Sequence, residues 1–346
     1  MDQATLRFVI QLLIIFFTFF MLINASAALV LAERKIMGFM QQRYGPYLVG
    51  PWGLLQPLAD IVKLLFKEEL RPKDADKWLF TLAPIISVTA AFAAFAAVPW
   101  GAETTLFGLL DTPVKLGVAD VNVAVLVVFA ITSMGVYGIV LAGWSSNSKY
   151  SLLGGLRSSA QMISYELAYA TALASVIMLA GSLSLREVVD AQNGSWFGFI
   201  PKWYVFLQPV GFLIYVIAGV AETNRAPFDF PEAEQELVAG YNTEYSSVRF
   251  ALFPQAEYIN MTTMAAVATD LYLGGWHGIA ILDRYGFGWV FFLAKVGFIL
   301  FTYIWVRWTV PRYRYDQLMQ FGWKWLFPAA VLNLIATAAA ILYFNV

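Results

Sequence analysis

Long apolar stretches recur along the whole sequence, and they constrain the fold more than any other feature. Each stretch is long enough to cross a hydrocarbon layer about 30 Å thick as a helix. Hydrophobic residues make up 60% of the 346 residues and charged residues only 13%, and a soluble core could not bury so much apolar surface. The sequence therefore predicts an all-α integral membrane protein, with residues 1–346 in a single membrane domain.

About eight transmembrane helices account for these stretches. The predicted spans are residues 8–31, 79–99, 121–142, 160–180, 204–221, 250–273, 287–308 and 325–344. Tryptophans gather near the span ends, for example Trp100, Trp144 and Trp203, as in the aromatic belts of membrane proteins. This belt supports the spans independently of hydropathy.

The distribution of Lys and Arg predicts the orientation of the spans. The odd-numbered loops hold sixteen of these residues, whereas the even-numbered loops and the N-terminal segment hold five. By the positive-inside rule, the odd loops face the cytoplasm and both termini face the periplasm. Although Ala25-Ser26-Ala27 resembles a signal-peptide cleavage site, the apolar run continues to the stop-transfer pattern Glu33-Arg34-Lys35, so we expect the first span to be retained.

The first cytoplasmic loop contains an amphipathic segment near residues 53–67. Leu58, Val62 and Leu65 repeat at helical spacing, with Asp60 and Lys63 on the other face. The pattern predicts a helix that lies in the membrane interface. Such a helix is either a general surface anchor or a lipid-facing wall beside a lateral opening for a hydrophobic substrate.

Residues that the chain lacks exclude several kinds of redox site. It has no cysteine and one histidine, His277, whereas iron-sulfur clusters need thiolates and haem and zinc sites need His or Cys. There is no Gly-rich dinucleotide motif, and the net charge of -1 without a basic block gives no reason to expect nucleic acid. We expect no metal, flavin or iron-sulfur cluster on this chain, and we interpret His277 as a solvated loop residue.

Three carboxylates lie within predicted spans or at their cytoplasmic ends. Glu166, Glu222 and Glu257 belong to three different spans and reach similar depths, within about 10 Å of the cytoplasmic boundary. A charge at the centre of a membrane helix costs about 2.5–3.5 kcal/mol, so each acid needs an explanation. We expect these acids to relay protons, with Lys295 of the seventh span as a counter-charge or further relay site. Structural ion pairs are the alternative.

The fifth connection, residues 222–249, is acidic on a face where basic residues are expected. It holds six acids against two arginines, and Phe228 and Phe230 stand among the charges. Disordered acidic tails are poor in aromatic residues. The composition therefore favours a structured, partly buried loop over a solvated acidic surface.

Several polar segments resemble one known family. They are Ala32-Glu33-Arg34-Lys35, Gln42-Arg43-Tyr44-Gly45-Pro46, Gly50-Pro51-Trp52-Gly53-Leu54-Leu55-Gln56-Pro57-Leu58-Ala59-Asp60, residues 221–245 (AETNRAPFDFPEAEQELVAGYNTEY) and Pro311-Arg312-Tyr313-Arg314-Tyr315-Asp316-Gln317-Leu318. The first, the acidic and the last of these loops look like those of the quinone-docking membrane subunit of respiratory complex I, the NADH dehydrogenase subunit 1 family. The matches spread from residue 32 to residue 318.

The resemblance implies a subunit of proton-translocating NADH:quinone oxidoreductase. Such a subunit forms the quinone-access tunnel at the junction with the hydrophilic arm and couples quinone reduction to proton translocation, without redox activity of its own. Quinone would be the substrate. The tunnel and coupling-loop residues implied by the resemblance are Glu33, Arg34, Lys35, Arg43, Asp60, Arg225, Phe228, Asp229, Glu232, Glu234 and Glu236.

The same resemblance implies the partners and the location. The partners would be hydrophilic quinone-site subunits with a terminal iron-sulfur cluster, small and antiporter-like membrane subunits that receive protons by way of the buried acids, and membrane lipid. The location would be the bacterial cytoplasmic (inner) membrane, with the mitochondrial inner membrane as the alternative. Other hypotheses are a homologous subunit of a proton-pumping hydrogenase-type complex, an autonomous ion transporter, for which paired half-repeats are missing, and a structural scaffold.

Overall fold

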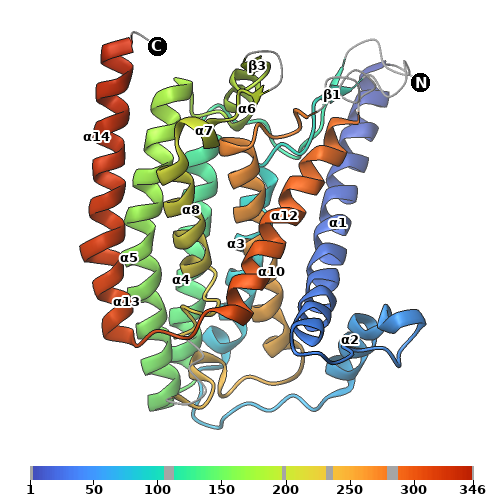
Figure 1. Cartoon of the computed structure of the whole chain (residues 1–346). Coiled ribbons are helices and arrows are strands. Elements are labelled where there is room, and N and C mark those ends of the chain that lie inside the picture. Colours follow the sequence, from blue (N-terminus) through green and yellow to red (C-terminus); the bar gives the residue numbers. More distant parts are fainter. Residues whose placement is uncertain (1–2, 105–112, 197–199, 231–236, 279–286, 345–346) are drawn as a thin grey trace.

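The computed structural model describes residues 3–104, 113–196, 200–230, 237–278 and 287–344. Its long helices form one bundle (Figure 1). They are α1 (Gln3–Met40), α3 (Lys77–Ala96), α4 (Ala124–Ser145), α5 (Lys149–Ala180), α8 (Pro209–Glu222), α10 (Ser247–Tyr272), α12 (Gly288–Thr309) and α14 (Phe327–Phe344).

Helix length and hydropathy confirm the predicted all-α membrane fold. Among the described residues, six helical segments are long and apolar enough to cross a membrane: α1, α3, α4, α5, α12 and the segment Tyr315–Tyr343 that contains α14. The apolar helix α8 is shorter, with 14 residues. Helix α10 has 26 residues and lies outside that set of six, yet it packs in the same bundle against α1, α3, α8 and α12.

Short elements connect the long helices. The helical ones are α2 (Gln56–Phe66), α6 (Leu185–Ala191), α7 (Tyr204–Leu207), α13 (Tyr315–Phe321), the 3-10 turns η1 (Pro51–Gly53) and η2 (Gly240–Asn242), and the π-helical turn η3 (Gly322–Leu326). The strands form two antiparallel pairs, β1 (Glu103–Thr104) with β2 (Val114–Lys115) and β3 (Ser195–Trp196) with β4 (Ile200–Pro201).

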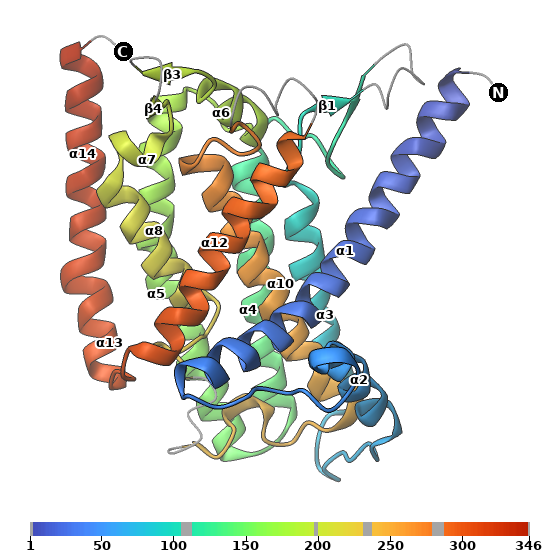
Figure 2. The same cartoon turned by 45° about the vertical axis from the view of Figure 1, so that its right-hand side comes forward.

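The bundle has two chemically different ends. Both termini, β1, β3 and α6 lie at one end, and α2 and α13 lie at the other (Figure 1). The connections that follow α1, α4, α8 and α12 all reach the end that carries α2. Helices α1 and α12 run obliquely across the other helices (Figure 2).

Small residues let the helices approach closely. At Gly138 of α4, a Cβ atom would lie 2.1 Å from Ser87 Oγ of α3 and 2.9 Å from the carbonyl oxygen of Ala83. Small residues at helix interfaces are the usual means of close packing within membranes. Gly138 therefore fixes the spacing between α3 and α4.

Helix α1 is longer than the predicted span 8–31, because it continues through Glu33-Arg34-Lys35 to Met40. The sequence places these charges in a loop, but the structure keeps them helical. Glu33 and Arg34 each meet oppositely charged side chains, Arg225 and Arg307 for Glu33 and Asp60 for Arg34. The charges are thus compensated without leaving the helix.

Helix α2 occupies most of the predicted amphipathic segment 53–67. It begins at Gln56, after the separate turn η1, and ends at Phe66. Its apolar residues Leu58, Leu65 and Phe66 are more than half exposed, although α2 also contacts α1 and α10. An apolar face left uncovered at the end of a membrane bundle is suited to contact lipid.

Candidate functional site

A cavity of about 470 Å³ lies where α1, α2, α10 and α12 meet near one end of the bundle. Its lining changes in character along these helices. The residues that line it are Ile23, Ser26, Ala27, Val30, Glu33, Arg34, Met37, Pro57, Asp60, Ile61, Leu64, Arg225, Phe250, Ala251, Pro254, Gln255, Glu257, Tyr258, Arg307 and Trp308. We call this space the α1–α2 cavity.

One part of the α1–α2 cavity is apolar, and another carries charges. Ile23, Ala27 and Val30 line it from α1, and Ile61 and Leu64 line it from α2. The charged part contains three acids and three arginines: Glu33, Asp60, Glu257, Arg34, Arg225 and Arg307. A site of this kind suits an amphiphilic molecule with an apolar chain and a polar head.

Glu33 is the most heavily paired acid of the charged part. It is only 5% exposed. Its carboxylate lies 3.4 Å from Nη1 of Arg225 and accepts a hydrogen bond from the Tyr258 hydroxyl at 2.6 Å. It also forms an ion pair with Arg307 of α12. Glu33 therefore ties together α1, α10, α12 and the loop after α8.

Arg225 connects Glu33 to a second acid, Glu257. The Nη2 atom of Arg225 lies 3.2 Å from Oε2 of Glu257, and the guanidinium stands 4.2 Å from the ring centre of Tyr258. Burial alone would lower the pKa of Arg225, but Tyr258, Glu257 and Glu33 together outweigh it and raise that pKa above its usual value. Arg225 thus stays charged, and its loss would leave both acids without this cation.

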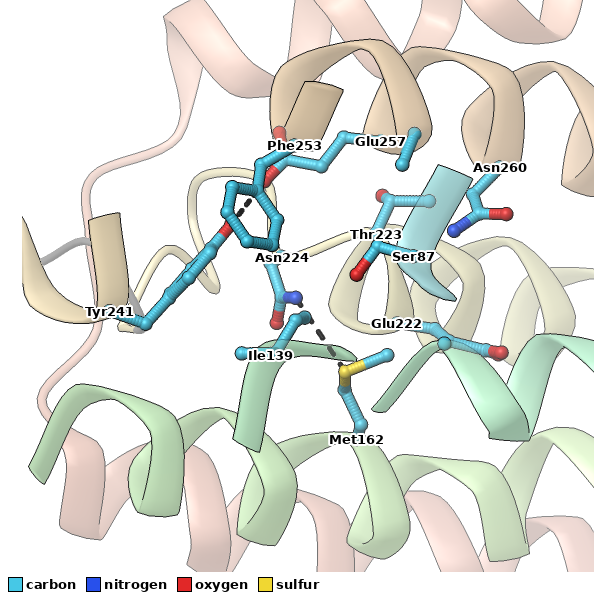
Figure 3. A pocket seen from close by; sticks show the side chains of 12 residues that line it. Ser87, Ile139, Met162, Glu222, Thr223, Asn224, Tyr241, Phe253, Glu257 and Asn260 are labelled. Atoms are coloured by element: carbon cyan, nitrogen blue, oxygen red, sulfur yellow. Dashed lines mark hydrogen bonds between the residues drawn. The ribbon is translucent and has the colours of Figure 1, made fainter. Parts of the chain in front are cut away.

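Glu257 also faces a smaller cavity, of about 20 Å³, deeper in the bundle. The hydroxyl of Tyr241 donates a hydrogen bond to Oε1 of Glu257 at 3.2 Å. Glu222 and Asn260 line the same small cavity, and Figure 3 shows Glu222 and Glu257 on different sides of it. A space of this size with polar walls can hold about one water molecule.

Glu222 is the most enclosed of the three predicted relay acids. It ends α8, and its Oε2 atom is buried without a hydrogen-bond partner among the described residues. Its electrostatic neighbour is Glu166 of α5, and Thr132 of α4 interacts with it as well. Glu166 itself accepts a hydrogen bond from the Ser133 hydroxyl of α4. The structure therefore brings all three predicted acids into one connected region.

Lys295 does not belong to that region. Its ammonium donates hydrogen bonds to the carbonyl oxygens of Leu273, Gly275 and His277, at 2.7, 2.9 and 2.5 Å. These oxygens follow the far end of α10, more than a dozen residues beyond Glu257, which is about 20 Å along a helix. The expectation that Lys295 neutralises the three acids directly has no support from this position.

His277 is not the solvated loop residue that we expected from its Gly-rich surroundings. Its side chain is 18% exposed, and Nε2 lies 3.5 Å from an oxygen of Asp190. The bonds that Lys295 makes to this turn hold it against the bundle. A lone histidine between glycines gave no sequence signal for that packing.

The other tunnel and loop residues implied by the resemblance lie around the charged part or in the adjoining loop. Arg34 bonds Asp60 of α2 at 2.7 Å, and Arg43 is exposed, beyond the end of α1. Lys35 is half-buried, next to Gly45. Glu232, Glu234 and Glu236 lie outside the described residues.

Two residues of the acidic loop are anchored by the last loop of the chain. Asp229 bonds Arg312 at 2.8 Å. Phe228 is buried and stacks on Tyr313, with the ring centres 5.9 Å apart. Gln161 of α5 donates a hydrogen bond to the carbonyl oxygen of Phe228 at 2.7 Å. The described part of this loop is therefore structured and partly buried, as its aromatic content indicates.

Sequence reasoning missed three residues of the charged part. Arg307 counted only as a loop cation in the orientation argument, and Tyr241 and Tyr258 carried no charge to draw attention. Tyr258 follows Glu257 directly, and Arg307 lies at the same membrane end as Glu33. A search for counter-ions at equal depth could have found Arg307, whereas the tyrosines needed the structure.

Comparisons with known proteins place the chain among relatives of similar length. A family model described as NADH dehydrogenase matches residues 11–338. The chain is 52% identical to H-type subunit 2 of the NADH-quinone oxidoreductase of Geobacter metallireducens, over 95% of this chain and 94% of that protein. It is 52% identical to H-type subunit 1 of the same enzyme from Geobacter sulfurreducens, covering 95% and 93%, and 48% identical to NADH-quinone oxidoreductase subunit 8 of Rhodothermus marinus, covering 94% and 96%.

Proposed function

This chain belongs to the NADH dehydrogenase family, and we propose that it is the membrane subunit of an NADH-quinone oxidoreductase that admits quinone through the α1–α2 cavity. The observation that carries the proposal is the cavity itself. It is bounded by the amphipathic helix α2, and its lining passes from apolar side chains to a charged cluster. Its volume of about 470 Å³ compares with about 170 Å³ for a cavity at the opposite end of the bundle.

A quinone fits the two parts of this cavity. Its isoprenoid tail is as apolar as lipid, so it can pass the exposed apolar face of α2 and lie against Ile23, Ala27 and Ile61. Its carbonyl oxygens accept hydrogen bonds, and Arg34, Arg225 and Arg307 are cationic donors along the charged part. The head group would travel past these residues toward partner subunits.

Quinone reduction needs reagents that this chain does not supply by itself. A quinone takes up two electrons and two protons to become a quinol, and the electrons would come from the iron-sulfur cluster of a hydrophilic partner. The chain would contribute binding, orientation and the proton side of the reaction. The residues in position to act on protons are Glu33, Glu257 and Tyr258.

Arg225 is the proposed link between quinone and the membrane acids. It binds Glu33 and Glu257 at once, so an anionic or polar head group near Arg225 would compete with Glu257 for its charge. Glu257 would then hold a proton more firmly, because a carboxylate that loses its cation favours the neutral form. The small cavity shared by Glu257 and Glu222 offers a route onward to Glu222 and Glu166.

The proposed setting is a bacterial cytoplasmic membrane, with the α2 end of the bundle in the cytoplasm and both termini in the periplasm. The excess of Lys and Arg in the odd-numbered loops supports that orientation. The hydrophilic subunits would then dock at the α2 end, and the antiporter-like subunits would continue the proton path within the membrane. A hydrogenase-type complex remains the second candidate, and co-purification of NADH dehydrogenase activity with this chain separates the two.

Filling the cavity from α1 tests the proposal. We expect Ala27→Phe, in the assembled enzyme, to raise KM for a long-tailed quinone because Ala27 lines the cavity. NADH oxidation by a soluble electron acceptor should not change, since that acceptor does not use the cavity. Ala28→Phe is the matched control, because Ala28 is exposed on α1 and does not line the cavity. Equal KM values for the two variants would overturn the proposal.

A further inference from the structure

A second cavity, of about 170 Å³, lies at the opposite end of the bundle and belongs to no part of the quinone path. It is formed by the start of α1, the end of α3, strand β2 and the start of α6. Its polar lining consists of three cations, one carboxylate and one amide: Arg7, Lys115, Arg186, Asp120 and Gln11. We call it the terminal-side cavity.

The gathering of cations here is unusual for this side of the protein. The even-numbered loops and the N-terminal segment contain five Lys and Arg residues in the whole sequence, because the positive-inside rule depletes them on this face. Three of those five line this single cavity. Such a concentration, where cations are scarce, needs an anion or a close set of carboxylates to balance it.

The carboxylates nearby balance the cations only in part. Asp120 pairs with Lys115, and one of its oxygens lies 3.9 Å from Nε of Arg186. Glu103 stands opposite Lys115 in the β1–β2 pair. Within the cavity lining, one carboxylate therefore faces three cations, which leaves an excess of positive charge.

Arg186 gives the cavity a fixed, largely buried donor. Its side chain is 11% exposed and its guanidinium stands 5.2 Å from the ring centre of Trp276. One Nη atom donates to the carbonyl oxygen of Gly101 at 3.4 Å, while Nε is buried without a hydrogen-bond partner among the described residues. An oxyanion in the cavity could accept from that atom.

The depth of the cavity matches the head-group layer of the bilayer. The apolar side chains of α1 that are exposed begin at Phe8 and continue through Leu13 and Phe16, so Arg7 marks the edge of the lipid-facing band. Trp100, which follows α3 at this level, contacts Phe17 of α1 with ring centres 6.1 Å apart. Tryptophan is the usual marker of the membrane interface.

We propose that the terminal-side cavity binds the phosphate head group of an anionic phospholipid, whose acyl chains lie along the exposed apolar face of α1. Arg7 and Lys115 would approach the phosphate from the solvent side, and Arg186 would hold it from within the cavity. A lipid is the source that the geometry favours over free phosphate, because the cavity adjoins the apolar band directly. This inference does not depend on the quinone proposal.

Photo-crosslinking of the assembled complex in lipid nanodiscs tests the site. The probe is phosphatidylglycerol with a photoreactive group next to its glycerol, and mass spectrometry follows labelling of residues 3–11 and 113–120. We expect Arg7→Gln and Lys115→Gln each to lower this labelling about fivefold, and the double variant about 25-fold, because each cation near an anionic lipid contributes about that factor. Lys202→Gln, an exposed cation of the same end outside the cavity, should label as the wild type does.

Competition separates the possible sources of the anion. Unlabelled phosphatidylglycerol should displace the probe, and phosphatidylcholine should not. Displacement by inorganic phosphate at the same concentration would overturn the lipid assignment, and equal labelling by a phosphatidylcholine probe would overturn anion recognition. Unchanged NADH:quinone reductase activity in the two variants would show that they fold and assemble, so that a loss of labelling reports on the cavity.

Discussion

At the scale of single residues, Arg225 holds the charged part of the α1–α2 cavity together. It lies 3.4 Å from Glu33 and 3.2 Å from Glu257, and its side chain is about one tenth exposed. The sequence alone marked Arg225 as a rare cation in an acidic loop, but it could not identify the two partners. Glu33 is 192 residues away along the chain, and only the crossing of α1 over the bundle brings it near.

Removing Arg225 should destabilise the protein strongly. Arg225→Met leaves Glu33 and Glu257 buried without that cation, and breaking a buried pair from one side costs about 3–5 kcal/mol. We expect a clear fall in the apparent melting temperature of the chain within the solubilised complex. Arg43→Met, which removes an exposed arginine, should leave the melting temperature near that of the wild type. Similar melting temperatures for the two variants would show that the Arg225 pairs contribute little.

Glu222 should matter for proton transfer more than for quinone reduction. It lies away from the α1–α2 cavity and faces the small cavity that it shares with Glu257. We expect Glu222→Gln, in proteoliposomes, to retain most quinone reductase activity but to move fewer protons per electron, because an amide cannot carry the proton. Glu187→Gln is the control, since Glu187 is exposed at the other end of the bundle. An unchanged proton-to-electron ratio in Glu222→Gln would argue against the relay.

At the scale of elements, hydropathy and Trp placement located the helical bundle, but the polar helix needed more. Helix α10 contains Glu257, Asp270 and several threonines, and it is identified as part of the bundle by its packing against four neighbours. Helix α1 passed its predicted end because ion pairs formed by distant residues compensate Glu33 and Arg34. Sequence periodicity carries no information about such partners, so boundaries set by long-range pairs were beyond prediction.

The apolar face of α2 should govern access of long-tailed quinones. Leu58 and Leu65 are exposed on that face, and we expect Leu58→Ser with Leu65→Ser to lower activity with a long-tailed quinone while activity with a short-tailed, water-soluble quinone persists. The physical reason is that α2 would lose contact with lipid beside the cavity. Lys63→Ser changes the same helix at an exposed polar position and serves as the control. Parallel loss with both quinones would indicate damage to the fold instead.

The contact between α3 and α4 should tolerate no added methyl group at Gly138. A Cβ there would lie 2.1 Å from Ser87 Oγ, and Ser87 is itself buried. We expect Gly138→Ala to destabilise the bundle by about 1–3 kcal/mol through overpacking, seen as reduced chain abundance and earlier thermal unfolding. Gly135→Ala lies one turn away with nothing within 4 Å of its new Cβ and should be close to neutral. If both variants behave alike, the close approach of α3 and α4 is not a constraint.

At the scale of the whole molecule, the two ends of the bundle have different tasks. The end with α2 gathers the large cavity, the acidic loop and the last loop, while the end with the termini holds the cations of the terminal-side cavity. The asymmetry of Lys and Arg along the sequence indicated which loops share an end. It could not indicate that α1, α2, α10 and α12 enclose a cavity, because that depends on the oblique course of α1 and α12 (Figure 2).

The most direct test of the central proposal is photoaffinity labelling of the assembled enzyme with an azido-quinone that carries a long isoprenoid tail. We expect label on peptides from α1, α2 and α10, protection by unlabelled quinone, and loss of label in Ala27→Phe but not in Ala28→Phe. Label found only on other helices of this chain or only on other subunits, with α1 and α10 unmodified, would contradict quinone access through the α1–α2 cavity.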